Sequence, residues 1–163
     1  MKRRIVGSLL LCAGLGLSVG LAWAAKKVET HVIDPDALKW GPAPNSLPSG
    51  AEVAMIDGDM TKKGSLFTIR IRMPDGYKVP PHFHPADEHV TVLSGALYMG
   101  LGDKLDESTA MEMRTGAFHA IPKGVHHWAY SKGQTIVQVH GVAPWGITYV
   151  NSADDPRKKA ASK

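Results

Sequence analysis

Three side chains of types that commonly bind metals lie close together near the middle of the sequence. Residues 76–95 read GYKVPPHFHPADEHVTVLSG and place His82, His84 and Glu88 between two glycines. In a β-strand alternate side chains share a face, so the two imidazoles would project from one side, about 6 to 7 Å apart. A proline interrupts the strand after His84, so a turn through residues 85–87 would return Glu88 on a neighbouring strand. Two nitrogens and a carboxylate oxygen can then meet at one metal ion.

These ligand types define a class of metal rather than one element. A mixed nitrogen and oxygen set suits one divalent ion of Fe, Mn, Ni or Zn and disfavours Cu(I), and the general affinity order does not choose among them. A second interpretation places both histidines on the surface of a proline-rich loop, with Glu88 as a solvated acid, because short metal patterns also occur by chance.

A second histidine segment follows about thirty residues later in the chain. From Gly116 the sequence reads GAFHAIPKGVHHWAYS, in which PKG marks a turn between two short apolar runs. The spacings in the two segments resemble the two motifs of the cupin superfamily. The first motif is matched by Gly76, His82, His84, Glu88 and Gly95, and the second by Gly116, Pro122, Gly124 and His127. The family pattern closes on Asn where this chain has Ser131, which affects a structural hydrogen bond rather than the ligand set.

The resemblance implies a ligand set and a fold. The implied metal ligands are His82, His84, Glu88 and His127, and the implied fold is an all-β double-stranded β-helix, or jelly-roll barrel. The neighbouring His126 is the alternative to His127, because a one-residue shift in register exchanges the two faces of a strand. The motif spacing favours His127.

Short strand-like runs agree with this fold. From Glu52 to Val150, β-rich runs alternate with Gly and Pro turn signals, as is typical of a sandwich or barrel. The run at 67–73 puts Arg70 and Arg72 on one face, which either points into the barrel to hold a carboxylate or lies outside in solvent. We expect the outer position for both arginines.

A later run supplies the candidate catalytic residues. The strand expected at 135–140 places Gln138 and His140 on one face, and the corresponding strands of cupins often line the cavity. The resemblance therefore implies that Gln138 and His140 orient a substrate or move a proton. The alternative for His140 is a buried, hydrogen-bonded structural role.

The first 24 residues have the pattern of a secretory signal peptide. Three basic residues precede an uncharged apolar stretch that ends in Ala22-Trp23-Ala24, so we expect cleavage near Ala24 and export to the periplasm or the exterior, without a stable membrane anchor. An uncleaved anchor is the alternative, although the stretch is short for a membrane span. The single cysteine, Cys12, lies in this segment, so the mature chain would contain neither disulfides nor thiolate ligands.

The rest of the chain divides into an arm, a barrel and a tail. We expect an arm at 25–50 anchored in the core by Trp40, a cupin domain at 51–150, and a polar tail at 151–163 that frays. Near the end of the barrel, Trp145 and Tyr149 either close a cavity or form a contact in a homodimer.

Composition narrows the class of partner. The chain has 19 Lys and Arg against 15 Asp and Glu, and without the three basic residues of the leader the net charge falls from +4 to +1. No basic stripe interleaved with aromatic residues is present, which argues against nucleic-acid binding and leaves a small molecule as the expected partner.

Three functions agree with these features. The first is a metal-dependent oxidoreductase, similar to a dioxygenase, that acts on a small oxygenated or aromatic molecule. The second is a non-catalytic barrel that binds a small ligand or is stabilised by its metal. The third is a metal-dependent isomerase or lyase. A fold alone does not choose among them.

Overall fold

The computed structural model describes residues 30–160, and the predicted signal peptide at 1–24 lies outside the described residues. Within the described part, no helix is both long and apolar enough to cross a membrane. Residues from Ile33 onward belong to a single unit, and the description below concerns that unit.

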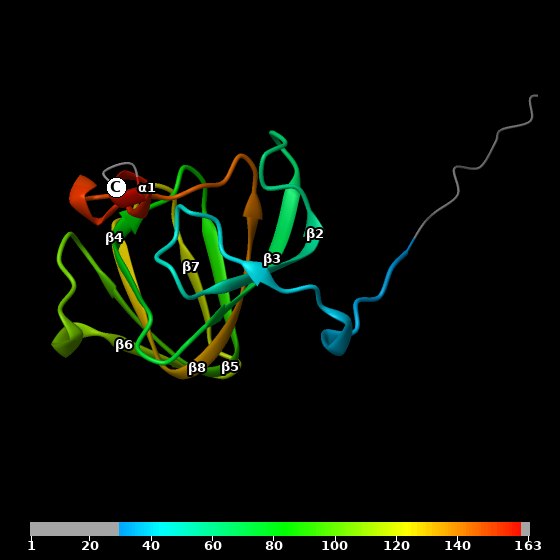
Figure 1. The fold of residues 1–163 in the computed structure, drawn as a ribbon, viewed down its shortest axis with the longest axis horizontal. Coiled ribbons are helices and arrows are strands. Elements are labelled where there is room, and N and C mark those ends of the chain that lie inside the picture. The colour runs from blue at the N-terminus through cyan, green and yellow to red at the C-terminus, as the bar shows by residue number, and fades with distance from the viewer. Residues whose placement is uncertain (1–29, 161–163) are drawn as a thin grey trace, which may run out of the picture. The chain divides into compact units, whose positions relative to one another are not determined.

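The unit is built almost entirely from antiparallel strands (Figure 1). In chain order the elements are η1 (Pro35–Ala37), β1 (Gly41–Pro42), β2 (Glu52–Gly58), β3 (Leu66–Met73), β4 (Lys78–Phe83), β5 (Glu88–Leu101), η2 (Glu107–Thr109), β6 (Met111–Arg114), β7 (Phe118–Ile121), β8 (His127–Val142), β9 (Thr148–Tyr149), η3 (Ser152–Asp154) and α1 (Pro156–Ala160).

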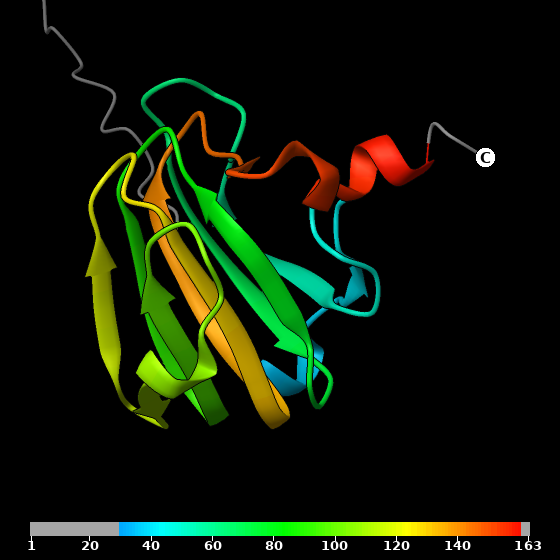
Figure 2. The same ribbon diagram turned by 90° about the vertical axis from the view of Figure 1, so that its left-hand side faces the viewer.

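The two longest strands, β5 and β8, organise the barrel. They pair with each other along most of their lengths, and Figure 2 shows the orange β8 running beside the green β5. The first part of β8 also pairs with β4 and the last part with β3, while β5 pairs with β6 and β7. The sheet curls around its own apolar face, and the prediction of an all-β jelly-roll barrel is confirmed.

A glycine permits the bend in β5. The register between β5 and β8 shifts on either side of Ser94, next to Gly95. Gly95 has a φ of +76°, and a Cβ added there would lie 2.5 Å from the carbonyl oxygen of Gln134. Both the left-handed conformation and the close approach require glycine at this position. The last glycine of the first motif therefore serves the bend between the two halves of β5.

Alternation along β3 separates the core from the solvent. Ile69 and Ile71 are buried, whereas Arg70 and Arg72 lie on the outer face. Arg70 Nε donates to Gln138 Oε1 at 3.2 Å, and Arg72 Nε donates to a carboxylate on β2 at 2.8 Å. The expectation that both arginines lie outside the barrel agrees with this geometry.

A serine joins β8 to the turn before β4. Ser131 is buried, accepts a hydrogen bond from the Tyr77 backbone N–H at 3.1 Å and donates to the carbonyl oxygen of Pro74. The residue that replaces the usual Asn of the second motif therefore makes two hydrogen bonds of its own.

The arm crosses the barrel, but not through the tryptophan that we expected to anchor it. Trp40 lies outside the core beneath the Arg72 guanidinium, 4.3 Å from the ring centroid, so the prediction of a core anchor is wrong. The Tyr149 hydroxyl donates to the carbonyl oxygen of Ser46 at 2.8 Å, and the Tyr77 hydroxyl donates to that of Pro48. Two buried tyrosines, rather than Trp40, hold the arm in place.

The tail forms η3 and α1 through residue 160, where we expected fraying. Arg157 pairs with Asp155 at 2.8 Å and donates to the carbonyl oxygen of Ile147 at 3.2 Å, which ties the tail to the segment before β9.

Candidate metal centre

Three histidines meet inside one end of the barrel. His82 and His84 come from the end of β4 and the residue just after it, and His127 is the first residue of β8. His82 lies directly opposite His127 in the β4–β8 ladder. One ring nitrogen from each histidine lies within 4.8 Å of those of the other two, so the three can hold one metal ion.

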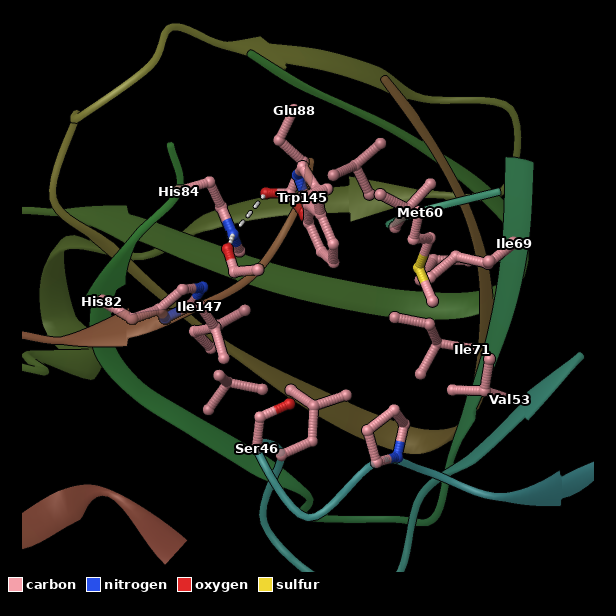
Figure 3. Close-up of a pocket in the computed structure, with 18 of the residues that line it drawn as sticks. Ser46, Val53, Met60, Ile69, Ile71, His82, His84, Glu88, Trp145 and Ile147 are labelled. Atoms are coloured by element: carbon pink, nitrogen blue, oxygen red, sulfur yellow. Dashed lines mark hydrogen bonds and ion pairs between the residues drawn. The ribbon is translucent and has the colours of Figure 1, made fainter. Parts of the chain in front are cut away.

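A carboxylate completes the cluster. Glu88, the first residue of β5, places Oε2 3.2 Å from His127 Nε2 and 3.5 Å from His84 Nε2, as Figure 3 shows for His84. All four residues are at most 6% exposed. The structure therefore brings together the four residues expected to be ligands, from three different elements and the turn between two of them.

Backbone carbonyls determine which nitrogen of each ring is free. His82 Nδ1 lies 2.7 Å from the oxygen of Pro80, His84 Nδ1 lies 2.6 Å from that of Gly146, and His127 Nδ1 lies 2.9 Å from that of Val125. A carbonyl oxygen only accepts hydrogen bonds, so each Nδ1 carries the proton. In the neutral ring Nε2 is then a lone-pair donor, as a metal ligand must be.

The unprotonated Nε2 atoms of the cluster suit a metal ion. Among the described residues, Nε2 of His84 and Nε2 of His127 are buried and have no hydrogen-bond partner. Glu88 is close to both, but an unprotonated Nε2 and an ionised carboxylate have no proton to share. Buried polar atoms without a partner cost about 1–3 kcal/mol each, and a divalent cation between these nitrogens and the carboxylate would remove that cost.

Electrostatics favour the ligand forms of these groups. Burial, together with the neighbouring His127 and His84, lowers the pKa of His82 to about 3, although Glu88 acts in the opposite direction. Burial raises the pKa of Glu88, whereas an Nε2–H on His127 or His84, or a cation in its place, lowers that pKa well below its usual range. At neutral pH the cluster therefore offers a neutral His82 and an ionised Glu88.

The adjacent histidine lies outside the cluster. The His126 side chain is 38% exposed, its Nδ1 lies 2.6 Å from Asp103 Oδ1, and its ring stacks on Phe83 with centroids 5.0 Å apart. The strand register thus turns His127 inward and His126 outward.

Gln138 and His140 do not reach the cavity, and the expectation that they line it is wrong. Val137 and Val139 line the cavity instead. Gln138 pairs with Arg70 on the outer face, and His140 stacks on His89 with centroids 4.9 Å apart. The physical reason is alternation. Because β8 is one continuous strand, the residues that share the face of His127 are the odd-numbered ones, and Gln138 and His140 lie on the opposite face.

The cluster opens into a cavity of about 270 Å³. Trp145 forms part of its wall and stacks on His84, with centroids 4.4 Å apart and planes 13° apart. Of the two roles considered for Trp145, lining the cavity is the one that the geometry supports. The arm contributes Ser46 and Leu47, and the β2–β3 loop contributes Met60. The sequence carried no signal for Met60, because a loop methionine has no periodicity to place it.

Comparison with known proteins agrees with this architecture. The family described as "Cupin domain" matches residues 69–142. Two germin-like proteins are similar in sequence: germin-like protein subfamily 2 member 1 of Arabidopsis thaliana is 35% identical over 58% of this chain, and germin-like protein 5-1 of Oryza sativa is 36% identical over 39%. The matches span 42% and 29% of those proteins, so the chain covers less than half the length of either relative.

Solved structures share the barrel. The polyketide cyclase RemF of Streptomyces resistomycificus superposes with a TM-score of 0.65 at 16% identity, covering 82% of this chain and 94% of that protein. A putative acetylacetone dioxygenase of Methylibium petroleiphilum gives a TM-score of 0.60 at 14% identity, covering 81% and 88%. An RmlC-like cupin of Shewanella frigidimarina gives a TM-score of 0.54 at 14% identity, covering 71% and 94%. Fold and site define a jelly-roll barrel able to hold a metal. The match of residues 69–142 to the cupin domain, together with this fold, supports membership of the cupin superfamily.

Proposed function

We propose that this protein is an exported, metal-dependent oxidoreductase of the dioxygenase type that acts on a small oxygenated or aromatic molecule. The observation that carries the proposal is the buried cluster of three histidines and one glutamate at the end of a largely apolar cavity. His82, His84, Glu88 and His127 would hold one divalent ion. When bound, a redox-active ion such as Fe, Mn or Ni would supply reactivity toward dioxygen.

The residues around the cluster prepare it for that role. The three carbonyl acceptors hold the imidazoles in the tautomer that leaves Nε2 free, which fixes ligand orientation before any metal arrives. Trp145 covers one face of His84 and keeps water from it. The aliphatic wall makes the space where a substrate would meet the metal largely apolar, which strengthens electrostatic interactions there.

The lining of the cavity favours redox chemistry over isomerisation or elimination. Those reactions need a general base beside the metal. Among the described residues that line the cavity, the titratable side chains are the four proposed ligands alone. A ligand engaged with the metal is a poor base, so the isomerase or lyase alternative lacks a residue for its central step. The dioxygenase named among the structural neighbours is compatible with this choice, although its likeness concerns the fold.

Elemental analysis tests the metal centre. The native protein should carry close to one equivalent of iron, manganese or nickel, and His84→Ala and His127→Ala should lose it. His126→Ala is the matched control, because it removes the adjacent imidazole outside the cluster. Metal-dependent dioxygen consumption with small oxygenated or aromatic compounds would then support the oxidoreductase. Native protein without metal, with variants that melt like wild type, would favour a non-catalytic binding barrel.

We also propose export through residues 1–24 and assembly as a homodimer. Export rests on the basic, apolar and Ala-x-Ala order of the leader. N-terminal sequencing of the native protein should find Ala25 first, and a start at Met1 would contradict cleavage. Light scattering should give twice the mass of the mature chain, and a monomeric mass would refute the dimer.

A further inference from the structure

The cavity is sharply divided in polarity. Its titratable side chains lie at the metal end, where His82, His84 and Glu88 occupy one side of the view in Figure 3. Ile69, Ile71 and Met60 lie on the other side, and aliphatic and methionine side chains form most of the remaining wall. Outside the four proposed ligands, the hydrogen-bonding side chains in the described lining are Ser46, Thr61 and Trp145.

No cationic side chain serves the apolar end. Among the described lining residues there is neither Lys nor Arg, because alternation on β3 turns Ile69 and Ile71 inward and the arginines outward. Arg70 and Arg72 are engaged there with Gln138 and with the Glu52 carboxylate. A carboxylate or phosphate at the apolar end would be buried without a partner, which costs far more than burying a neutral polar group.

The metal end accepts a limited charge. Metal ligands bind in their deprotonated forms, so a divalent ion held by the Glu88 carboxylate and three imidazole nitrogens would leave one net positive charge. That end therefore suits one anionic oxygen or a pair of oxygens from a neutral chelator. Size sets a further limit. An apolar cavity of about 150 Å³ holds benzene, so by proportion this one suits a ligand of about eleven non-hydrogen atoms.

We propose that the ligand of this cavity is a small molecule with an oxygen-bearing, metal-chelating head and an uncharged apolar body. Aromatic or aliphatic compounds with two neighbouring oxygens at one end fit this description. Sugars, amino acids, dicarboxylates and phosphorylated compounds do not, because each brings a second polar group into the aliphatic end. This inference rests on the proposed metal centre for the head of the ligand, but on the cavity wall alone for its body.

A pair of isosteric probes tests the proposal without turnover. Zinc-loaded protein is titrated calorimetrically with 4-isopropylcatechol and with 3,4-dihydroxybenzoate. The first compound carries an isopropyl group where the second carries a carboxylate. Catechol, which has neither group, gives the affinity of the chelating head alone. We expect the isopropyl compound to bind at least about 100-fold more tightly than the carboxylate. Equal binding, tighter binding of the carboxylate, or binding of neither probe by protein with stoichiometric zinc would overturn the proposal.

Two additions separate this inference from the proposed function. Zinc content is measured in the same sample, so a missing metal centre is recognised directly. In that event isopropylbenzene and benzoate, an isosteric pair without a chelating head, test the cavity wall alone, with the same preference for the apolar member expected. Since zinc is redox-inactive, failure of the dioxygenase reaction leaves this result unaffected.

A charge introduced into the wall should reverse the selection. Met60 lies in a loop, where Met60→Lys adds a cation to the cavity with little disturbance of the strands. We expect the affinity for 3,4-dihydroxybenzoate to rise about tenfold in this variant. Met55→Lys makes the same change at an exposed position outside the cavity and should leave that affinity within about twofold. Equal gains in both variants, or no gain in Met60→Lys while wild type accepts the carboxylate, would overturn the proposal.

Discussion

The inner and outer faces of β8 each carry a histidine cluster, and the two clusters differ in how their rings are held. Inside, the centroids of His82 and His84 are 5.0 Å apart, and outside, those of His89 and His140 are 4.9 Å apart. The outer rings stack face to face at 19°, and His89 also stacks on Phe118. Proximity is therefore equal in the two clusters, and proximity alone does not make a metal site.

The inner cluster differs in three respects that matter for a metal. Each inner Nδ1 is engaged by a backbone carbonyl, each inner ring is buried, and the Glu88 carboxylate lies beside two of the free nitrogens. Within the described residues, the inner histidines form the group of three whose donor atoms lie within 4.8 Å. Tautomer control and a buried negative charge, rather than the number of imidazoles, distinguish the two faces.

Removing one histidine from each face should distinguish the inner cluster from the outer cluster most clearly. His127→Ala removes a direct metal ligand. Loss of a residue that only hydrogen-bonds to a ligand typically lowers metal affinity about 10- to 100-fold, so we expect a loss of at least about 100-fold here. His140→Ala should leave metal affinity unchanged. Competition with a chromophoric chelator measures both variants. A comparable loss in His140→Ala would show that the outer cluster takes part in metal binding.

Neutralising the inner carboxylate tests its role separately. Glu88→Gln keeps the shape of the side chain and removes its charge, so we expect metal affinity to fall about 10- to 100-fold while the fold persists. The same chelator competition gives the affinity, and circular dichroism checks the fold. Asp87→Asn, an adjacent change at an exposed position, is the control. Unchanged affinity in Glu88→Gln would remove the glutamate from the ligand set.

The bend that brings β5 along β8 should be sensitive to a single methyl group. Gly95→Ala combines a left-handed backbone with a Cβ 2.5 Å from a carbonyl oxygen, so we expect a loss of about 2–4 kcal/mol in the free energy of unfolding. Gly116→Ala has a similar φ of +88° but nothing within 4 Å of the new Cβ, and should lose only about 1 kcal/mol. Urea denaturation measures both. Equal losses would mean that the close approach at Gly95 relaxes easily.

The smallest effects should come from neighbours on the two faces at the far end of β8. Val139→Ala removes buried methyl groups from the cavity wall and should cost about 1–3 kcal/mol of stability. Gln138→Ala removes one hydrogen bond on the outer face and should cost about 0.5–1 kcal/mol, with metal content and turnover unchanged. Thermal unfolding and steady-state rates provide the comparison. A large loss of turnover in Gln138→Ala would restore the catalytic role first expected for it.

Much of the site could be predicted from local spacing. The step of two between His82 and His84 and the glycines around them place two imidazoles on one side of a strand end. The choice of His127 over His126 also followed from motif spacing, and the geometry agrees. The assignment of Gln138 and His140 failed because the strand expected at 135–140 was considered apart from His127, and its inner face was taken from the family resemblance. Counted as one strand from His127, the same alternation directs both residues outward.

The sequence by itself determined the ligand types, their spacing and the alternation of faces, because these depend on neighbouring residues and the geometry of a strand. Only the tertiary structure decided which distant groups complete the site. The carbonyl of Gly146, 62 residues from His84, sets the tautomer of that ring, and Trp145 covers it. The position of Trp40 could not be predicted for the same reason, because an aromatic ring can pack in a buried core or stack against the guanidinium of Arg72. Such pairings depend on how the chain closes on itself, which no local pattern records.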